Sequence, residues 1–174
     1  MRPKITKQNI KTLLETKFIK VFDLQYAEGR HYYNATRRSA DDLVAVKSTE
    51  EFQNMLPDAV SCITIWNPSN GEPKLLLNRE FRYPAGQFLL SVPAGLIDPA
   101  DKVEDEPLLV TAKRELKEET GAVEFHMDPV CVYSVTGKTR VNDKADEETF
   151  GMLFTADIFS FEPIHSEIEK ILIT

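Results

Sequence analysis

The sequence predicts a mixed α/β fold, an α/β/α sandwich around a mixed sheet, with a β-hairpin appendage at the N-terminus. Strand-like apolar runs surround one central helix, and strands and helices do not alternate as they do in a doubly wound parallel sheet. A chain of 174 residues, 42% of them hydrophobic, can bury one substantial core but is short for two full-sized domains. We therefore expect an appendage of one helix and a β-hairpin over residues 1–48, and a main domain over residues 49–174.

The appendage is indicated by two runs of alternating apolar and polar residues, 18–22 and 32–36, separated by Glu28-Gly29. A two-stranded unit is marginal in water, and this hairpin cannot bury both of its faces alone. We therefore expect residues 16–46 to pack against a second copy of the chain in a two-fold homodimer.

The main domain is predicted from five further strand-like runs and the helix between them. The runs cover residues 60–66, 74–81, 88–92, 130–135 and 149–158. The helix covers residues 107–120, because Pro107 loses no hydrogen bond at a first helical position and Gly121 accepts a left-handed cap. A second, short helix is expected over residues 166–173.

Charge and hydropathy exclude several classes of partner. The formal net charge is −7, which argues against nucleic acid or an anionic membrane as the main partner, since both reward clustered Lys and Arg. Residues 1–18 lack the continuous apolar stretch of a secretory signal, and no segment approaches the ~20 apolar residues that span a membrane. The cytoplasm is therefore the expected location, and an anionic substrate would need local cations or metal ions.

The predicted helix concentrates three carboxylates on one face. An advance of about 100° per residue places Glu118 and Glu119 on either side of Glu115, at the edge of the face that packs on the sheet. A hard divalent cation such as Mg²⁺ relieves the repulsion among such groups, and Arg114, four residues before Glu118, is spaced to hold one of them. The alternative is an ordinary solvated, salt-bridged helix face.

The segment before the helix makes the metal-binding interpretation more specific. Here the chain reads Pro93-Ala94-Gly95, and the helix then carries the sequence Arg114-Glu115-Leu116-x-Glu118-Glu119-x-Gly121. This combination resembles the signature box of the Nudix hydrolases. The resemblance implies a Nudix-like fold, hydrolysis of the diphosphate of a nucleoside-diphosphate derivative, and Mg²⁺ as the cofactor, with Mn²⁺ as a substitute. It also implies that the metal ligands are the carbonyl oxygen of Ala94 and the carboxylates of Glu115, Glu118 and Glu119.

One departure from the family pattern concerns the first acidic residue of the box. The pattern places five residues between its Gly and this acid, whereas ten residues separate Gly95 from Glu106. Asp101 occupies the place counted from Gly95, and Glu106 occupies it counted from Arg114. An insertion in a surface loop has little entropic cost, so the spacing leaves both candidates open.

Further roles follow from the branch that the chain resembles, the ADP-ribose and nucleotide-sugar pyrophosphatases. In that branch a later loop supplies a carboxylate that activates water, which favours Glu148 and, almost equally, Glu147. Arg82 is placed to bind a phosphate with its guanidinium fork, and Tyr83 to stack on a base. Arg38 is a further phosphate or base contact, for which a solvated strand end is the alternative. The hairpin is expected to help form the partner's substrate site.

The substrate is the least specified feature. ADP-ribose, cut to AMP and ribose 5-phosphate, is the leading expectation. A nucleotide sugar of the GDP-mannose or ADP-glucose type is the first alternative, because Gly137 stands where ADP-ribose-preferring relatives carry Pro. A non-catalytic Nudix-like nucleotide sensor is the second, although three intact carboxylates argue against it.

Overall fold

A computed structural model describes residues 5–138, 145–164 and 170–173; it does not describe the side chains at 49, 53, 134–150 and 170–173. The chain forms two compact units, residues 1–56 and 57–174, so the division follows Leu56 where the sequence predicted it after residue 48. The predicted mixed α/β class with an N-terminal β appendage is confirmed.

Unit 1 is a three-stranded antiparallel sheet in the order β1-β2-β3. Its strands are β1 (Ile10–Glu15), β2 (Lys20–Ala27) and β3 (Arg30–Thr36). The predicted hairpin is β2–β3, which turns at Gly29. A small core of buried Phe22, Leu24 and Leu43 lies under it. Three short helical segments complete the unit: η2 (Ala40–Asp42), η3 (Val44–Val46) and α1 (Thr49–Gln53).

The N-terminal helix predicted for the appendage is wrong for the described residues. Among the described residues, the 3₁₀ turn η1 (Lys7–Asn9) is the only helical segment before the first strand, and the chain then continues as β1 alongside β2. A third strand supplies partners for the backbone groups of β2 that a two-stranded hairpin leaves open, which explains the preference for strand here.

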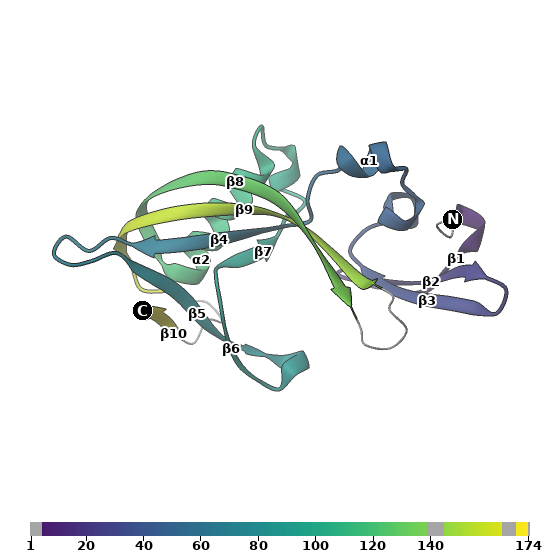
Figure 1. The fold of residues 1–174 in the computed structure, drawn as a ribbon, viewed down its shortest axis with the longest axis horizontal. Coiled ribbons are helices and arrows are strands. Elements are labelled where there is room, and N and C mark those ends of the chain that lie inside the picture. The colour runs from purple at the N-terminus through teal and green to yellow at the C-terminus, as the bar shows by residue number, and fades with distance from the viewer. Residues whose placement is uncertain (1–4, 139–144, 165–169, 174) are drawn as a thin grey trace. The chain divides into compact units, whose positions relative to one another are not determined.

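Unit 2 is built on a seven-stranded mixed sheet (Figure 1). Its strands are β4 (Ala59–Trp66), β5 (Lys74–Arg82), β6 (Gln87–Ser91), β7 (Ala94–Leu96), β8 (Ala122–Lys138), β9 (Ala145–Phe161) and β10 (Lys170–Ile173). The order is β10-β5-β4-β9-β8, with β6 paired to β5 and β7 paired to β4. Among the described strands of this sheet, β4 and β9 run parallel and the other pairs are antiparallel. Two 3₁₀ turns, η4 (Tyr83–Ala85) and η5 (Asp101–Val103), lie in its loops.

The five predicted strands of the main domain all appear, but three features differ. β8 begins immediately after the helix and is much longer than residues 130–135, because it pairs with β9 along its length. β7 was not predicted. The helix expected over 166–173 is wrong for Lys170–Ile173, which form β10 beside β5, while 166–169 lie outside the described residues. The open edge of β5 needs hydrogen-bond partners, and β-branched Ile171 and Ile173 favour a strand.

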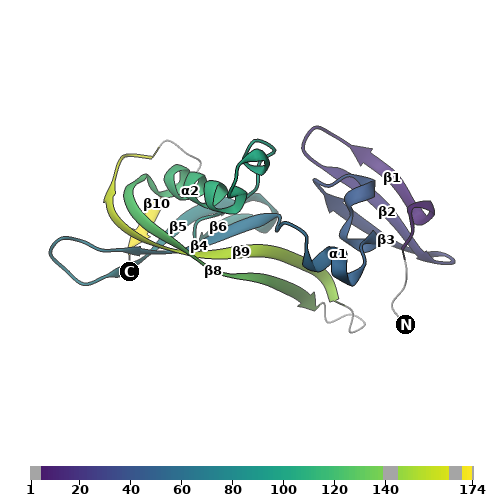
Figure 2. The same cartoon turned by 90° about the horizontal axis from the view of Figure 1, so that it is seen from above.

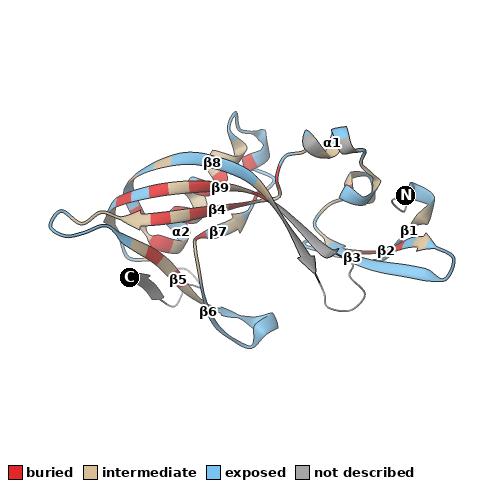
Figure 3. Ribbon diagram, in the orientation of Figure 1, coloured by how far each residue is buried: buried red, intermediate tan, exposed pale blue. Residues whose placement is uncertain are grey.

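The helix α2 (Pro107–Thr120) has the predicted bounds and lies against one face of the sheet (Figure 2). Its buried Ala112 and Leu116 pack on alternate residues of β4 and β9. Along these strands, buried residues alternate with less buried ones (Figure 3). This packing leaves the carboxylates of α2 at the margin of the buried face. Within the described ranges, no helix is long and apolar enough to cross a membrane.

The end of α2 provides a test of this packing. Gly121 is left-handed, with φ of 72°, and a Cβ there would collide with the backbone oxygen of Glu162. Gly86 is also left-handed, but a Cβ there would meet nothing within 4 Å. We expect Gly86→Ala to cost ~1–2 kcal/mol of unfolding free energy, the usual penalty of left-handed backbone, and Gly121→Ala at least ~3 kcal/mol. Urea denaturation measures both, and equal losses would contradict the packing described.

Candidate active site

Two carboxylates of α2, those of Glu115 and Glu119, lie against the short strand β7. The backbone N–H of Ala94 donates to Oε2 of Glu119 at 3.2 Å. The carboxylate of Glu115 lies over Gly95 so closely that a Cβ at this position would collide with it. Gly95 is not left-handed, so its role is to permit this approach and not to allow an unusual backbone conformation.

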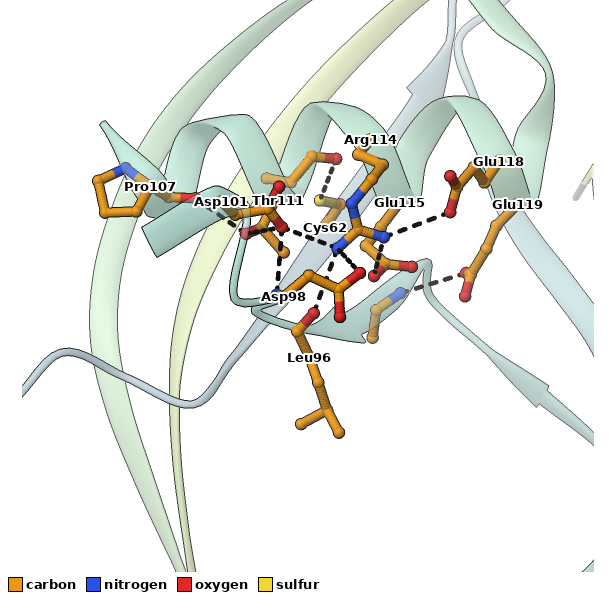
Figure 4. Close-up of polar contacts among 12 residues, drawn as sticks. Cys62, Leu96, Asp98, Asp101, Pro107, Thr111, Arg114, Glu115, Glu118 and Glu119 are labelled. Atoms are coloured by element: carbon orange, nitrogen blue, oxygen red, sulfur yellow. Dashed lines mark hydrogen bonds and ion pairs between the residues drawn. The ribbon is translucent and has the colours of Figure 1, made fainter. Parts of the chain in front are cut away.

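Arg114 connects the carboxylates to the loop before the helix (Figure 4). Its NH1 donates to Oε1 of Glu115 at 2.8 Å and to Oε2 of Glu118 at 3.3 Å. Its NH2 donates to Oδ2 of Asp101 at 2.9 Å and to the backbone oxygen of Leu96 at 3.3 Å. One guanidinium therefore neutralises part of the charge on α2 and fixes the loop to the helix.

The loop before α2 distinguishes the two candidates for the first acidic residue of the box, Asp101 and Glu106. Asp101 is only 7% exposed and also accepts hydrogen bonds from Oγ1 of Thr111 at 2.9 Å and the backbone N–H of Asp98 at 3.2 Å. Glu106 is exposed. It occupies the N-cap position of α2, but its side chain forms no capping hydrogen bond. The additional residues, 102–106, are all exposed. Asp101 thus occupies the position beside Arg114, and the insertion follows it.

Electrostatics reflect this arrangement. Burial acts to raise the pKa of Asp101, but the hydrogen bonds from Arg114, Thr111 and Asp98 outweigh it, so the pKa is lowered. Burial raises the pKa of Glu115, and the charge of Arg114 only partly opposes this. The folded protein therefore favours the ionised form of Asp101, whereas burial disfavours the ionised form of Glu115.

Glu119 has no cationic partner among the described residues and is held by neutral donors. Nδ2 of Asn78, on β5, donates to Oε2 of Glu119 at 2.6 Å. Burial raises the pKa of Glu119 to about 7, and the charges of Glu115 and Glu80 act in the same direction, against the hydrogen bonds from Ala94 and Asn78. Asn78 and Glu80 were not among the site residues predicted from the sequence. The available signal was a polar residue at the end of the apolar run Leu75-Leu76-Leu77.

The donor types at this site fit a hard divalent cation. In the described part of the chain, no three acidic, His or Cys side chains are grouped as they would be around an ion, and Arg114 donates hydrogen bonds to Glu115 and Glu118. Carboxylate and carbonyl oxygens are nevertheless the ligands that Mg²⁺ prefers, and two of the carboxylates have raised pKa values that a bound cation would lower. Burial also raises the pKa of the nearby Cys62 thiol, to about 12, so this thiol is neutral.

The candidate substrate residues lie in both units. Arg82 ends β5 and forms an ion pair with Glu80 at 3.2 Å. Tyr83 is 87% exposed, with its ring edge-to-face against Phe81. Arg38 belongs to unit 1, where NH1 donates to Oδ2 of Asp42 at 2.8 Å.

The side chains of the candidate bases, Glu147 and Glu148, lie outside the description. Their backbones belong to β9 and not to a loop, and they pair with Gly137 and Thr136 of β8. The role of either residue stays a prediction.

The loop network yields a prediction about stability. Asp101→Asn should lower the unfolding free energy by about 1.5–3 kcal/mol at pH 7, the usual contribution of hydrogen bonds to charged groups. The folded-state pKa of Asp101 lies below its unfolded value of ~3.9, so its stabilisation is complete above that value and is lost as the pH falls through the folded value. Urea denaturation should show the difference shrinking below pH ~4.

Glu106→Gln is the matched control, because it alters the other candidate acid at an exposed position. It should change stability little at any pH. A larger loss in this variant than in Asp101→Asn would reverse the assignment of the two residues.

Residues 55–170 match the family model for the NUDIX domain. Two relatives are similar to the chain in sequence. The chain is 39% identical over 102 residues, 58% of its length, to an uncharacterized Nudix hydrolase of Schizosaccharomyces pombe. It is 30% identical over 118 residues, 67% of its length, to the ADP-ribose pyrophosphatase of Saccharomyces cerevisiae. Each match covers 46% of the relative, so the chain spans about half the length of these proteins.

A solved structure supports the same fold. A pyrophosphohydrolase of Bacillus subtilis is similar with a TM-score of 0.50 and 22% identity, covering 68% of this chain and 62% of that one. The family model spans both the β7 segment and the helix whose carboxylates meet it. The chain therefore belongs to the Nudix family.

Proposed function

We propose that this chain is a Mg²⁺-dependent hydrolase that cleaves the diphosphate of a nucleoside-diphosphate derivative, with ADP-ribose as the leading substrate and AMP and ribose 5-phosphate as products. The observation that carries the proposal is the convergence of Glu115 and Glu119 on the Ala94-Gly95 segment. The match to a yeast ADP-ribose pyrophosphatase supports this substrate.

The metal would be held by the carboxylates of Glu115, Glu118 and Glu119 and the carbonyl oxygen of Ala94, with Mn²⁺ as a substitute. When bound, it would polarise the phosphoryl oxygens and lower the pKa of the attacking water. Arg114 keeps Glu115 and Glu118 oriented from the other side. The protein thus contributes mainly charge and position.

We assign removal of the water's proton to Glu148, with Glu147 as the alternative. Support comes from the backbone register, because both residues lie on β9 beside the end of β8. Comparing the Glu→Gln variants of both residues distinguishes them.

Substrate binding is assigned to Arg82 and Tyr83. Asn78, Glu80 and Arg82 share one face of β5 because alternate residues of a strand point the same way. Asn78 contacts Glu119, and Glu80 contacts Arg82, so this row extends from the proposed metal site towards the η4 turn. An Arg at the end of this row is suited to bind a phosphate. The exposed Tyr83 ring offers a surface for a base.

The surface of unit 1 is relevant to the proposed homodimer. Leu13, Phe18 and Tyr33 are exposed apolar residues of its small sheet and turn. We propose that this unit packs on a second copy in a homodimer, to which Arg38 contributes a further substrate contact. A cytoplasmic location stays a prediction.

The first test is removal of a metal ligand. Glu115→Gln and Glu119→Gln should each lower turnover of ADP-ribose by at least ~100-fold, the scale of lost electrostatic stabilisation, while the protein remains folded. Product formation at saturating Mg²⁺ measures this, with circular dichroism as the check on folding. Wild-type protein that hydrolyses no diphosphate substrate would support a nucleotide sensor instead.

The second test concerns the substrate. ADP-ribose should have the highest kcat/KM among ADP-ribose, ADP-glucose, GDP-mannose and UDP-glucose, since a relative that is 30% identical to this chain over 118 residues is an ADP-ribose pyrophosphatase. Gly137 is the feature that favours a nucleotide sugar. A ten-fold preference for a compound without adenine, about 1.4 kcal/mol, would overturn the choice of substrate but not the reaction.

A further inference from the structure

Asn78 is an unusual residue for its position. It is 0% exposed in β5, where the other fully buried residue is the apolar Leu76. Its Nδ2 donates to Glu119 at 2.6 Å, while its Oδ1 is buried without a hydrogen-bond partner among the described residues. An unpaired buried carbonyl opposes folding, so packing does not explain an amide here.

The amide acts on one particular oxygen of Glu119. Oε2 accepts from Nδ2 of Asn78 and also from the backbone N–H of Ala94 at 3.2 Å. These donors come from β5 and β7, two different strands, so together they fix the plane of the carboxylate. Oε1 has no hydrogen-bond partner in the part of the chain that the structure describes.

The amide orientation follows from the partner. Turned the other way, Asn78 would place its carbonyl oxygen against a carboxylate oxygen, which is repulsive when Glu119 is ionised. A buried amide can donate to the ionised carboxylate and thereby favour it over the protonated form.

We propose that Asn78 is a positioning residue for the metal. Its hydrogen bond occupies Oε2 of Glu119, so that Glu119 would ligate the metal through Oε1 alone. The inference rests on the proposed metal-dependent function. Residues that hydrogen-bond to metal ligands orient them, and their loss typically lowers metal affinity by 10–100-fold. Asn78 is placed to do this from a rigid strand beneath the site.

Thr64 provides a matched comparison. It is also 0% exposed, on the neighbouring strand β4, and its Oγ1 donates to the backbone oxygen of Leu76 at 2.9 Å. Its hydroxyl is thus satisfied by the sheet itself. Changing Thr64 to Val removes a buried polar group from the same core, while the hydrogen bonds of Glu119 remain.

The experiment measures Mn²⁺ binding to the full chain without substrate, by electron paramagnetic resonance of free Mn²⁺, together with the melting temperature. Asn78→Leu removes the donor at similar size and should raise the Mn²⁺ dissociation constant by ~10-fold or more. Thr64→Val should leave the dissociation constant within twofold, even where it lowers the melting temperature. Asn78→Val, which suits a strand, replaces the Leu variant if that one does not fold.

The outcomes separate this inference from the proposed function. Wild-type protein that binds Mn²⁺, with affinity lost in Glu119→Gln but unchanged in Asn78→Leu, overturns the positioning role alone. Wild-type protein that does not bind Mn²⁺ overturns the proposed function and this inference with it. An equal loss of affinity in Thr64→Val also overturns the role, because it would reflect general destabilisation of the sheet.

Discussion

The mutual repulsion of three carboxylates on one side of α2 is the constraint on which the rest of the site depends. Arg114 lies between Glu115 and Glu118 and offsets part of their charge. Glu119 receives only neutral donors, and its pKa is raised to about 7. A helix with such a face is stable because the adjoining face, with Ala112 and Leu116, is fully buried against the sheet. The packing of this buried face therefore offsets the repulsion of the charges at its margin.

The strand β4 positions both α2 and β7. Val60 and Cys62 of β4 pack beneath α2, beside Ala112. The same stretch of β4 pairs with β7, placing Val60 opposite Gly95, and the N–H of Cys62 donates to the oxygen of Pro93 at 2.8 Å. The spacing between the helix and the Ala94-Gly95 backbone is thus fixed by the register of a single buried strand. Gly95 then allows the carboxylate of Glu115 to reach that backbone.

What the sequence predicted and what it did not can be separated by the range of the interactions involved. The bounds of α2 follow from local chemistry, Pro107 at its start and Gly121 at its end, and were predicted correctly. The choice between Asp101 and Glu106 depends on which carboxylate reaches Arg114, and no spacing rule contains that contact. β10 similarly forms because the edge of β5 is open to it, although the local pattern favoured a helix. Long-range partners decided these cases.

Asn78 shows the same limit at the level of a single side chain. A polar residue in an apolar strand run usually lies at a solvated edge of the sheet. Nothing near Asn78 in the sequence indicates that its partner is Glu119, forty-one residues away. In the fold it is the counterpart of Gly95: the glycine makes room for one carboxylate, and the asparagine orients another. Both residues serve groups whose ionised form the metal-free fold disfavours. A cation that binds only the folded arrangement would stabilise it by mass action, so the burial of these carboxylates would link the stability of the protein to the metal.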